Sequence, residues 1–221
     1  GQLDVRRFLI RRGFKIWPSY FVFVAFMFLL EAVGHHQGIV GGLRSVLPNL
    51  LHLQNYLGSP REHTWSLAVE EHFYLALPLL LLLLLRRRKD ASRPLAVLPH
   101  IALALAVGCA LLRWYVYAHP TWYNPHFATH LRIDSLFFGV LLGYFYHFEP
   151  ERLAFAERRA VTLLCVGVLM LLPYPAYITH HFGTVLMGAL GFAYMYVAYG
   201  CALLAILHLP LGRGWVGRRL G

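Results

Sequence analysis

The feature that most constrains this chain is a series of long apolar segments separated by polar or basic connectors. A helix of about 20 mostly apolar residues crosses the hydrocarbon core of a bilayer. Six segments of the 221-residue chain meet this requirement, namely residues 14–33, 64–85, 95–118, 131–148, 160–178 and 183–209. The sequence therefore predicts an all-α integral membrane bundle of about six transmembrane helices, forming a single domain over residues 1–221.

The composition favours a helical membrane protein over two other classes. Hydrophobic residues make up 58% of the chain and charged residues only 14%, which is more apolar than a typical soluble domain. The unbroken apolar run from Leu79 to Leu85 does not show the alternation of a β-barrel strand. The net charge of +10 comes largely from arginines clustered between apolar runs, whereas nucleic-acid binding needs a basic patch or stripe on one face. We therefore expect the lipid bilayer as a partner, and no nucleic acid.

The connectors alternate in charge, and this alternation predicts the orientation of the helices. Cytoplasmic connectors of membrane proteins are enriched in Lys and Arg. Four connectors are rich in arginine: "VRRFLIRRGFK", "RRRKDASR", "ERLAFAERR" and "GRGWVGRR". The three others carry His, Pro, Asn and aromatic residues instead. Six spans with both ends of the chain in the cytoplasm satisfy this pattern.

The first candidate site is the stretch "HTWSLAVEEHFY", which opens the second apolar segment. A carboxylate more than one turn inside a membrane helix is desolvated, so a partner or a functional role is the default interpretation of Glu70. The alternative is that Glu70 and Glu71 only favour the positive N-terminal end of a helix. Residues three and four apart share one side of a helix. This spacing predicts a polar seam of His63, Ser66, Glu70 and Tyr74, with Glu71 on the adjoining stripe.

The second candidate site is the basic stretch before the first apolar segment. Arg7, Arg11 and Lys15 are spaced by four and Arg12 and Lys15 by three, so a helix would gather them on one side. Such a cluster on the cytoplasmic side could hold a phosphate-bearing ligand, with arginine supplying forked donors. The alternative is a plain topology anchor. Pro18 would kink this helix or mark its first turn.

The third candidate site is the stretch "HLRIDSLFFGVLLGYFY", which opens a span with almost no other charge. Arg132 and Asp134 are two residues apart and point in different directions, so each is expected to meet another helix. Glu70 is a candidate partner for Arg132. A substrate-binding role and a buried ion pair that fixes helix packing are both open. Gly139 and Gly143 form a G-x-x-x-G, a weak indication of close packing.

Metal and thiol chemistry receive no support from the sequence. The 13 histidines show no H-E-x-x-H or comparable spacing, and the three cysteines all lie within apolar runs. We expect no metal site and no permanently bound cofactor.

Three of these stretches, in their order and spacing, resemble the membrane acyltransferase family often called acyltransferase 3. They are "FLIRRGFKIWPSY", "HTWSLAVEEHFYLALP" and "LRIDSLFFGVLLGY". The similarity covers most of residues 1 to about 145, and the remainder shares only hydropathy. The resemblance implies an O-acyltransferase of the bacterial inner membrane. It would move an acyl group, such as acetyl, from acyl-CoA to a hydroxyl of a surface carbohydrate or a lipid-linked acceptor.

The resemblance also implies roles for individual residues. The basic pair of the family falls on Arg12 and Lys15, where lysine replaces the more usual arginine, and this region is associated with the acyl-CoA donor. With the candidate sites above, the predicted catalytic residues are Glu70, Glu71 and His63. The predicted donor-binding residues are Arg11, Arg12 and Lys15. The predicted acceptor-binding residues are Arg132, Asp134, Ser66 and Tyr74.

One departure from the family pattern concerns the general base. Family members begin with two further spans, and the first ends in a histidine thought to act as the base. We expect this chain to lack those spans and the last ones, and to have little or no transferase activity by itself. Two other classes stay open: a transporter or permease whose intramembrane charges line a path, and a non-catalytic membrane scaffold.

Overall fold

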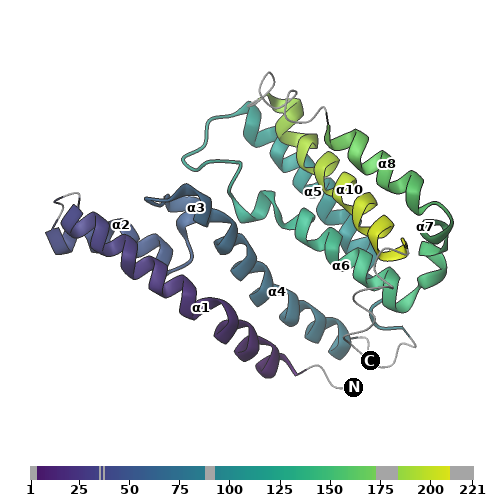
Figure 1. Cartoon of the computed structure of the whole chain (residues 1–221), viewed down its shortest axis with the longest axis horizontal. Coiled ribbons are helices and arrows are strands. Elements are labelled where there is room, and N and C mark those ends of the chain that lie inside the picture. The colour runs from purple at the N-terminus through teal and green to yellow at the C-terminus, as the bar shows by residue number, and fades with distance from the viewer. Residues whose placement is uncertain (1–3, 35, 37, 88–92, 173–183, 210–221) are drawn as a thin grey trace. The chain divides into compact units, whose positions relative to one another are not determined.

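The computed structural model describes residues 4–34, 36, 38–87, 93–172 and 184–209, which form helices joined by turns with no strand among them (Figure 1). This confirms the prediction of an all-α protein. The chain divides into two compact units. The first contains Gly1–Ala96 and Thr121–His130, and the second contains Val97–Pro120 and Leu131–Gly221. The single membrane domain over residues 1–221 stays a prediction.

Among the described residues, four helical stretches are long and apolar enough to cross a membrane: Val5–Gly34, Glu62–Arg87, Leu98–Ala118 and Val185–His208. They coincide with four of the predicted spans and make the chain an integral membrane protein. The predicted spans 131–148 and 160–178 contain shorter apolar helices, and part of the latter lies outside the described residues. Six crossings and two cytoplasmic ends therefore stay predictions.

Helix α1 (Val5–Leu29) begins at the capping residue Asp4, whose Oδ1 accepts a hydrogen bond from the backbone N–H of Arg7 at 2.9 Å. The helix continues through Pro18, which therefore does not mark its first turn. The chain then passes into a π-helical turn, Leu30–Gly34.

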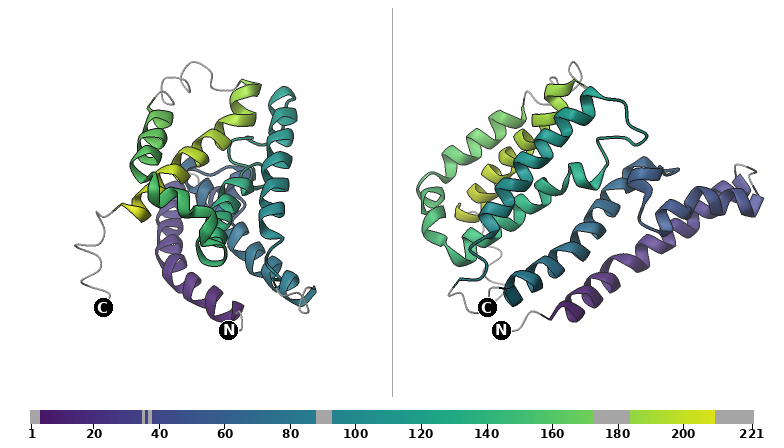
Figure 2. Two further views of the ribbon diagram at one scale, coloured as in Figure 1. Left: turned by 90° about the vertical axis from the view of Figure 1, so that its right-hand side faces the viewer. Right: turned by 180° about the vertical axis from the view of Figure 1, so that it is seen from behind.

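Helix α2 (Gly38–Leu50) folds back along α1 and the π-helical turn (Figure 2). A Cβ at Gly42 would lie 2.7 Å from the Cβ of Ala32, so only glycine permits this approach. Val46 of α2 joins an apolar cluster with three residues of α1, Tyr20, Val24 and Met27. The sequence predicts a connector rather than a span for these residues, because the apolar stretch of α2 is too short to cross a bilayer.

Helices α3 (Gln54–Leu57) and α4 (Trp65–Arg87) complete the first unit together with the connector 121–130. The ring of Trp65 stacks on Phe127 with 5.1 Å between ring centres. Asn55 Nδ2 donates to Thr129 Oγ1 at 2.8 Å and to the carbonyl of Phe127 at 3.3 Å. This connector is therefore held against α3 and α4.

The second unit contains α5 (Leu98–Ala118), α6 (Ile133–Phe148), α7 (Ala154–Arg158), α8 (Ala160–Leu171) and α10 (Val185–His208) (Figure 2). Helix α10 packs against α8 and α5. A Cβ at Gly167 would lie 2.8 Å from the carbonyl oxygen of Ala198, so this glycine allows α8 to approach α10. The indication that Gly139 and Gly143 mediate close packing is wrong, since no described side chain or neighbouring backbone lies within 4 Å of a Cβ at either position.

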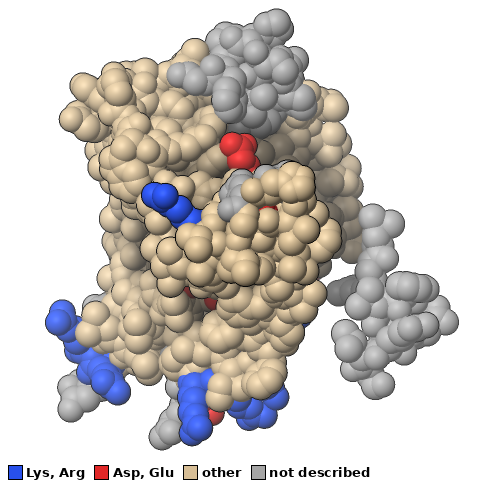
Figure 3. Space-filling view, turned by 90° about the vertical axis from the view of Figure 1, so that its left-hand side faces the viewer, with Lys and Arg blue, Asp and Glu red and all other residues tan. Residues whose placement is uncertain are grey.

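Large apolar side chains cover much of the helix surfaces. Val22, Leu79, Leu111 and Ile206 are each more than 60% exposed and lie on four different helices. Figure 3 shows a face that is mostly uncharged, with Lys and Arg gathered mainly along one edge. Such exposure is costly in water and is expected of helices that face lipid.

Candidate active site

The basic stretch of α1 and the acidic stretch of α4 meet at the side chain of Arg12. Its Nη2 lies 3.3 Å from Oε1 of Glu71 and 3.6 Å from Oε2 of Glu70. The guanidinium carbon lies 3.1 Å from the ring centre of Tyr74, which makes a cation–π contact. Two of the predicted sites are thus one site, which we call the Arg12 site: Arg12, Glu70, Glu71 and Tyr74.

Glu71, rather than Glu70, is the more enclosed carboxylate of the Arg12 site. The Glu71 side chain is 7% exposed, whereas that of Glu70 is 41% exposed. Glu71 also accepts a hydrogen bond from Nε1 of Trp17 at 3.3 Å. Helical spacing alone favours Glu70 as the functional carboxylate, because Glu70 shares a stripe with Ser66 and Tyr74. The structure instead assigns the greater desolvation to Glu71.

The contact between Arg12 and Glu71 corrects the predicted placement of the two stretches. The arginine-rich connector with Arg12 is predicted to be cytoplasmic, and with both chain ends in the cytoplasm the second span would begin, with its two glutamates, at the opposite face of the membrane. At about 1.5 Å per helical residue, Glu71 lies about 9 Å beyond Trp65 along α4, and Arg12 lies about 33 Å before Gly34 along α1. The two helices are therefore offset lengthwise, so that residues predicted at opposite membrane faces contact each other.

The other predicted members of the seam lie apart from this contact. Ser66 Oγ donates to the carbonyl of His63 at 3.5 Å, and the His63 ring lies 6.1 Å from that of Phe23. Within the described residues, no hydrogen bond or ion pair joins Ser66 or His63 to Arg12 or to Glu71. Their roles stay predictions.

The other basic residues of α1 are exposed to the surroundings. Arg7 and Arg11 line an open depression of about 410 Å³ next to Arg12, with Asp4 and Phe8 as its remaining lining residues. Lys15 is exposed and does not line this depression. The depression brings three guanidinium groups of one helix to one opening, which is chemistry suited to an anionic ligand. Lys15 as a donor-binding residue stays a prediction.

Arg12 has a buried hydrogen-bond donor that is not used within the described residues. Its Nε is buried and has no acceptor among the described residues. A buried donor of a charged group without a partner is costly. The Arg12 site therefore offers a directed donor to an anionic or carbonyl oxygen, in addition to the two carboxylates.

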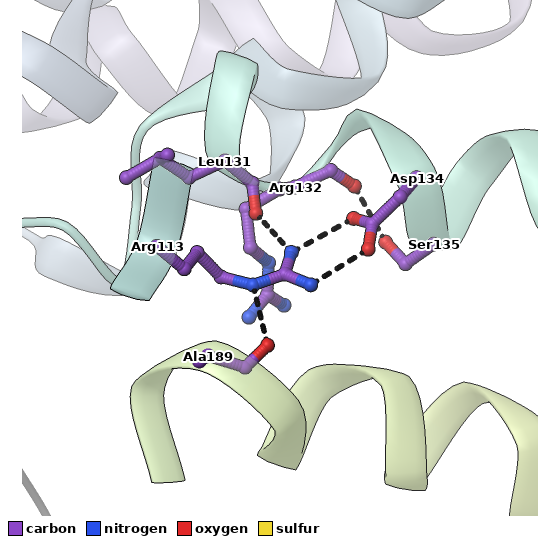
Figure 4. Close-up of polar contacts among 6 residues, drawn as sticks. All are labelled: Arg113, Leu131, Arg132, Asp134, Ser135 and Ala189. Atoms are coloured by element: carbon purple, nitrogen blue, oxygen red, sulfur yellow. Dashed lines mark hydrogen bonds and ion pairs between the residues drawn. The ribbon is translucent and has the colours of Figure 1, made fainter. Parts of the chain in front are cut away.

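Asp134 is part of a different constellation, centred on Arg113 of α5 (Figure 4). Arg113 donates through Nη1 to Oδ1 at 3.0 Å and through Nη2 to Oδ2 at 2.9 Å, and both side chains are fully buried. Arg113 also donates to the carbonyls of Leu131 at 2.7 Å and Ala189 at 3.1 Å. These contacts join α5, α6 and α10 and favour the interpretation of Asp134 as part of a packing ion pair. Arg113 is not among the predicted site residues, although an arginine inside an apolar segment signals a buried partner.

The side chain of Arg132 extends towards α10 (Figure 4). Its guanidinium carbon lies 4.0 Å from the ring centre of Phe192 on α10. Arg132 thus contacts α10, and Asp134 pairs with Arg113 of α5, so each of them meets another helix. Glu70 as a partner of Arg132 stays a prediction, because the two residues belong to different units.

A buried polar cluster behind the Arg12 site is also absent from the residues predicted from the sequence. Tyr20 donates through its hydroxyl to the carbonyl of Asn49 at 2.8 Å, and Gln54 donates to the Tyr20 hydroxyl and to the Thr64 carbonyl. His52, with a left-handed backbone (φ 53°), stacks on Tyr20. Burial lowers the pKa of His52 and so favours a neutral imidazole. The signal was present in the amides and imidazole of residues 49–54.

The motif residue His72 extends this cluster towards the connector 121–130. Its Nδ1 lies 2.8 Å from Oγ1 of Thr129, which also accepts from Asn55. Among the described residues, no group of three or more His, Cys, Asp or Glu side chains is placed to hold a metal ion.

Comparison with known proteins places this arrangement in a family. A family model described as "Acyltransferase domain" matches residues 1–221, so the chain belongs to that acyltransferase family. The match confirms the resemblance drawn from the three motifs. It also extends beyond residue 145, where the motifs had ended the similarity.

A more particular likeness is to the peptidoglycan O-acetyltransferase OatA of Listeria monocytogenes serovar 1/2a. The two sequences are 24% identical over an alignment of 190 residues, and the match covers 77% of this chain and 29% of that protein. The chain thus spans less than a third of the length of this relative. No solved structure matches the chain.

Proposed function

We propose that this chain is the membrane part of an O-acyltransferase that transfers an acetyl group from acetyl-CoA to a hydroxyl of a cell-surface carbohydrate in the bacterial inner membrane. Membership of an acyltransferase family and the likeness to a peptidoglycan O-acetyltransferase support this proposal. The observation that carries it is the convergence of Arg12, Glu71 and Tyr74, from two separate motifs, in one half-buried site.

The chemistry of acyl transfer explains why such a site combines these groups. A general base takes the proton of the acceptor hydroxyl, the hydroxyl oxygen attacks the thioester carbonyl, and the carbon–sulfur bond breaks so that CoA leaves as the thiolate. Negative charge grows on the carbonyl oxygen, where a positioned donor lowers the barrier. The buried Nε of Arg12 is such a donor. Glu71 holds the guanidinium of Arg12 in place and assists the removal of the hydroxyl proton. Arg7 and Arg11, which line the depression, attract the phosphate groups of acetyl-CoA.

The test is acetyl transfer in membranes that contain the intact protein, supplied with radiolabelled acetyl-CoA and cell-wall saccharide. Arg12→Ala should lower the rate by about 10²–10³-fold, the effect of removing one oxyanion donor. Arg6→Ala is the matched control, because Arg6 lies on the same helix, is exposed and does not line the depression. Equal rates for the Arg12→Ala, Arg6→Ala and parent proteins would argue for transport or a scaffold instead.

A further inference from the structure

A second basic pocket, of about 430 Å³, lies in the first unit where the membrane-spanning stretch Val5–Gly34 ends. Its charged lining residues are Glu31 of the π-helical turn, Arg44 of α2 and Arg61, which directly precedes the short 3-10 helix Glu62–Thr64. The volume falls within the range of small-molecule sites, about 300–1,000 Å³.

The position of the two arginines in the sequence is unusual. The three connectors that are predicted to lie outside the membrane contain no Lys or Arg other than Arg44 and Arg61. Outer connectors are generally poor in these residues, so topology does not account for this pair. The fold nevertheless brings both arginines, which are 17 positions apart, to one pocket. Their meeting indicates a local use for positive charge.

Buried hydrogen bonds hold the two arginine-bearing walls of the pocket together. Asn49 of α2 donates through Nδ2 to Oγ1 of Thr64 at 3.1 Å, and Thr64 Oγ1 donates to the carbonyl of Arg61 at 2.8 Å. Asn49 and Thr64 are fully buried. The backbone N–H of Arg61 also donates to Oγ of Ser59 at 3.2 Å. The helix that carries Arg44 is therefore tied to the backbone of Arg61, and the fold itself positions the pair.

Both guanidinium groups are available to a ligand. Arg44 and Arg61 are exposed, and neither side chain forms a hydrogen bond or an ion pair with another of the described residues. A guanidinium presents a fork of N–H donors that matches the oxygens of a phosphate group. Two arginines and Glu31 give the pocket a formal excess of one positive charge, which the single negative charge of a phosphodiester balances.

Apolar side chains border this charged pocket. Leu57 lines the pocket and is 58% exposed. On α2, Leu43 directly precedes Arg44 and Leu47 lies one turn further on, and both leucines are nearly half exposed. Residues four apart share one side of a helix, so Leu43 and Leu47 form an apolar stripe beside the arginine. A ligand with an anionic head and a hydrocarbon tail would satisfy both parts of this surface.

We propose that this pocket binds the phosphate group of an anionic membrane phospholipid, phosphatidylglycerol. Arg44 and Arg61 donate to the phosphate oxygens, and an acyl chain lies along Leu43 and Leu47. The end of a membrane-spanning helix is the depth at which the headgroup layer begins. The lipid site uses no residue of the Arg12 site and does not depend on the function proposed above.

Photolabelling with a lipid probe tests this proposal. The intact protein is reconstituted in phosphatidylcholine vesicles that contain a photoreactive phosphatidylglycerol, and the labelled segment is identified by mass spectrometry after pepsin digestion. We expect label within residues 43–61, and added unlabelled phosphatidylglycerol should suppress it. Labelling of this segment should fall by about tenfold in the double variant Arg44→Ala and Arg61→Ala. The double variant Arg44→Lys and Arg61→Lys keeps both charges and should retain part of the labelling.

The matched control is the double variant Arg86→Ala and Arg87→Ala. It also removes two exposed arginines of the first unit, but at the end of α4 and outside the pocket. This control should leave the labelling of residues 43–61 unchanged. Equal labelling of that segment in the parent and in Arg44→Ala with Arg61→Ala would overturn the proposal. Stronger suppression by inorganic phosphate or by a polyprenyl phosphate than by phosphatidylglycerol would also overturn it, in favour of a free phosphate or a lipid-linked carrier.

Discussion

The two arginines that contact carboxylates from other helices, Arg12 and Arg113, are built in opposite ways. Arg113 is fully buried, pairs with Asp134 through two bonds of 2.9 and 3.0 Å, and donates two further hydrogen bonds to backbone carbonyls. Arg12 is 15% exposed, contacts Glu71 and Glu70 at 3.3 and 3.6 Å, and leaves Nε without a partner among the described residues. A saturated arginine holds helices together, whereas an unsaturated one is available to a ligand.

The largest effect is expected at the saturated pair. Arg113→Ala would leave Asp134 as a buried charge without its partner, which costs about 3–5 kcal/mol. We expect a strongly lowered thermal unfolding temperature in detergent and reduced protein in the membrane.

The matched control replaces both members of that pair with apolar residues. The double variant Arg113→Met and Asp134→Leu leaves no unpaired charge and should recover much of the lost stability. If Arg113→Ala unfolds at the same temperature as the parent, the packing role of this pair is refuted.

A smaller effect, on activity rather than stability, is expected within the Arg12 site. Glu71 is enclosed and bonded to Arg12 and Trp17, whereas Glu70 is 41% exposed. Glu71→Gln should therefore lower acetyl transfer by at least about tenfold, in the range typical of acid–base or positioning groups. Glu70→Gln, the matched control, should have the smaller effect. If Glu70→Gln lost more acetyl-transfer activity than Glu71→Gln, Glu70 would be the more important carboxylate, as helical spacing alone suggested.

The contrast between these two regions also shows which features of the protein can be predicted from the sequence. Hydropathy was sufficient to predict the four long helices, because burying an apolar stretch in lipid depends on its length and composition. The motifs named Arg12, Glu70, Glu71 and Tyr74 but assigned them to two membrane faces. The lengthwise offset of α1 and α4 depends on packing such as that of α2 on α1, which no local pattern encodes.

Arg113 illustrates a second limit of sequence reasoning. It lies alone in the run "GCALLRWYVYA", and its partners come from α6 and α10, up to 76 residues away in the chain. A lone charge in an apolar segment signals that a partner exists. The identity of the partner follows only from the three-dimensional arrangement.

The central claim is that the Arg12 site serves the reaction, while the Arg113 pair serves the fold. Its most direct test compares two charge-conserving variants, Arg12→Lys and Arg113→Lys, which both lose the forked donors of guanidinium. Thermal unfolding and acetyl transfer are measured on the same preparations. Arg12→Lys should unfold close to the parent temperature with a clearly reduced transfer rate, and Arg113→Lys should unfold at a markedly lower temperature. Normal transfer by Arg12→Lys, or equal unfolding temperatures for Arg113→Lys and the parent, would contradict this account.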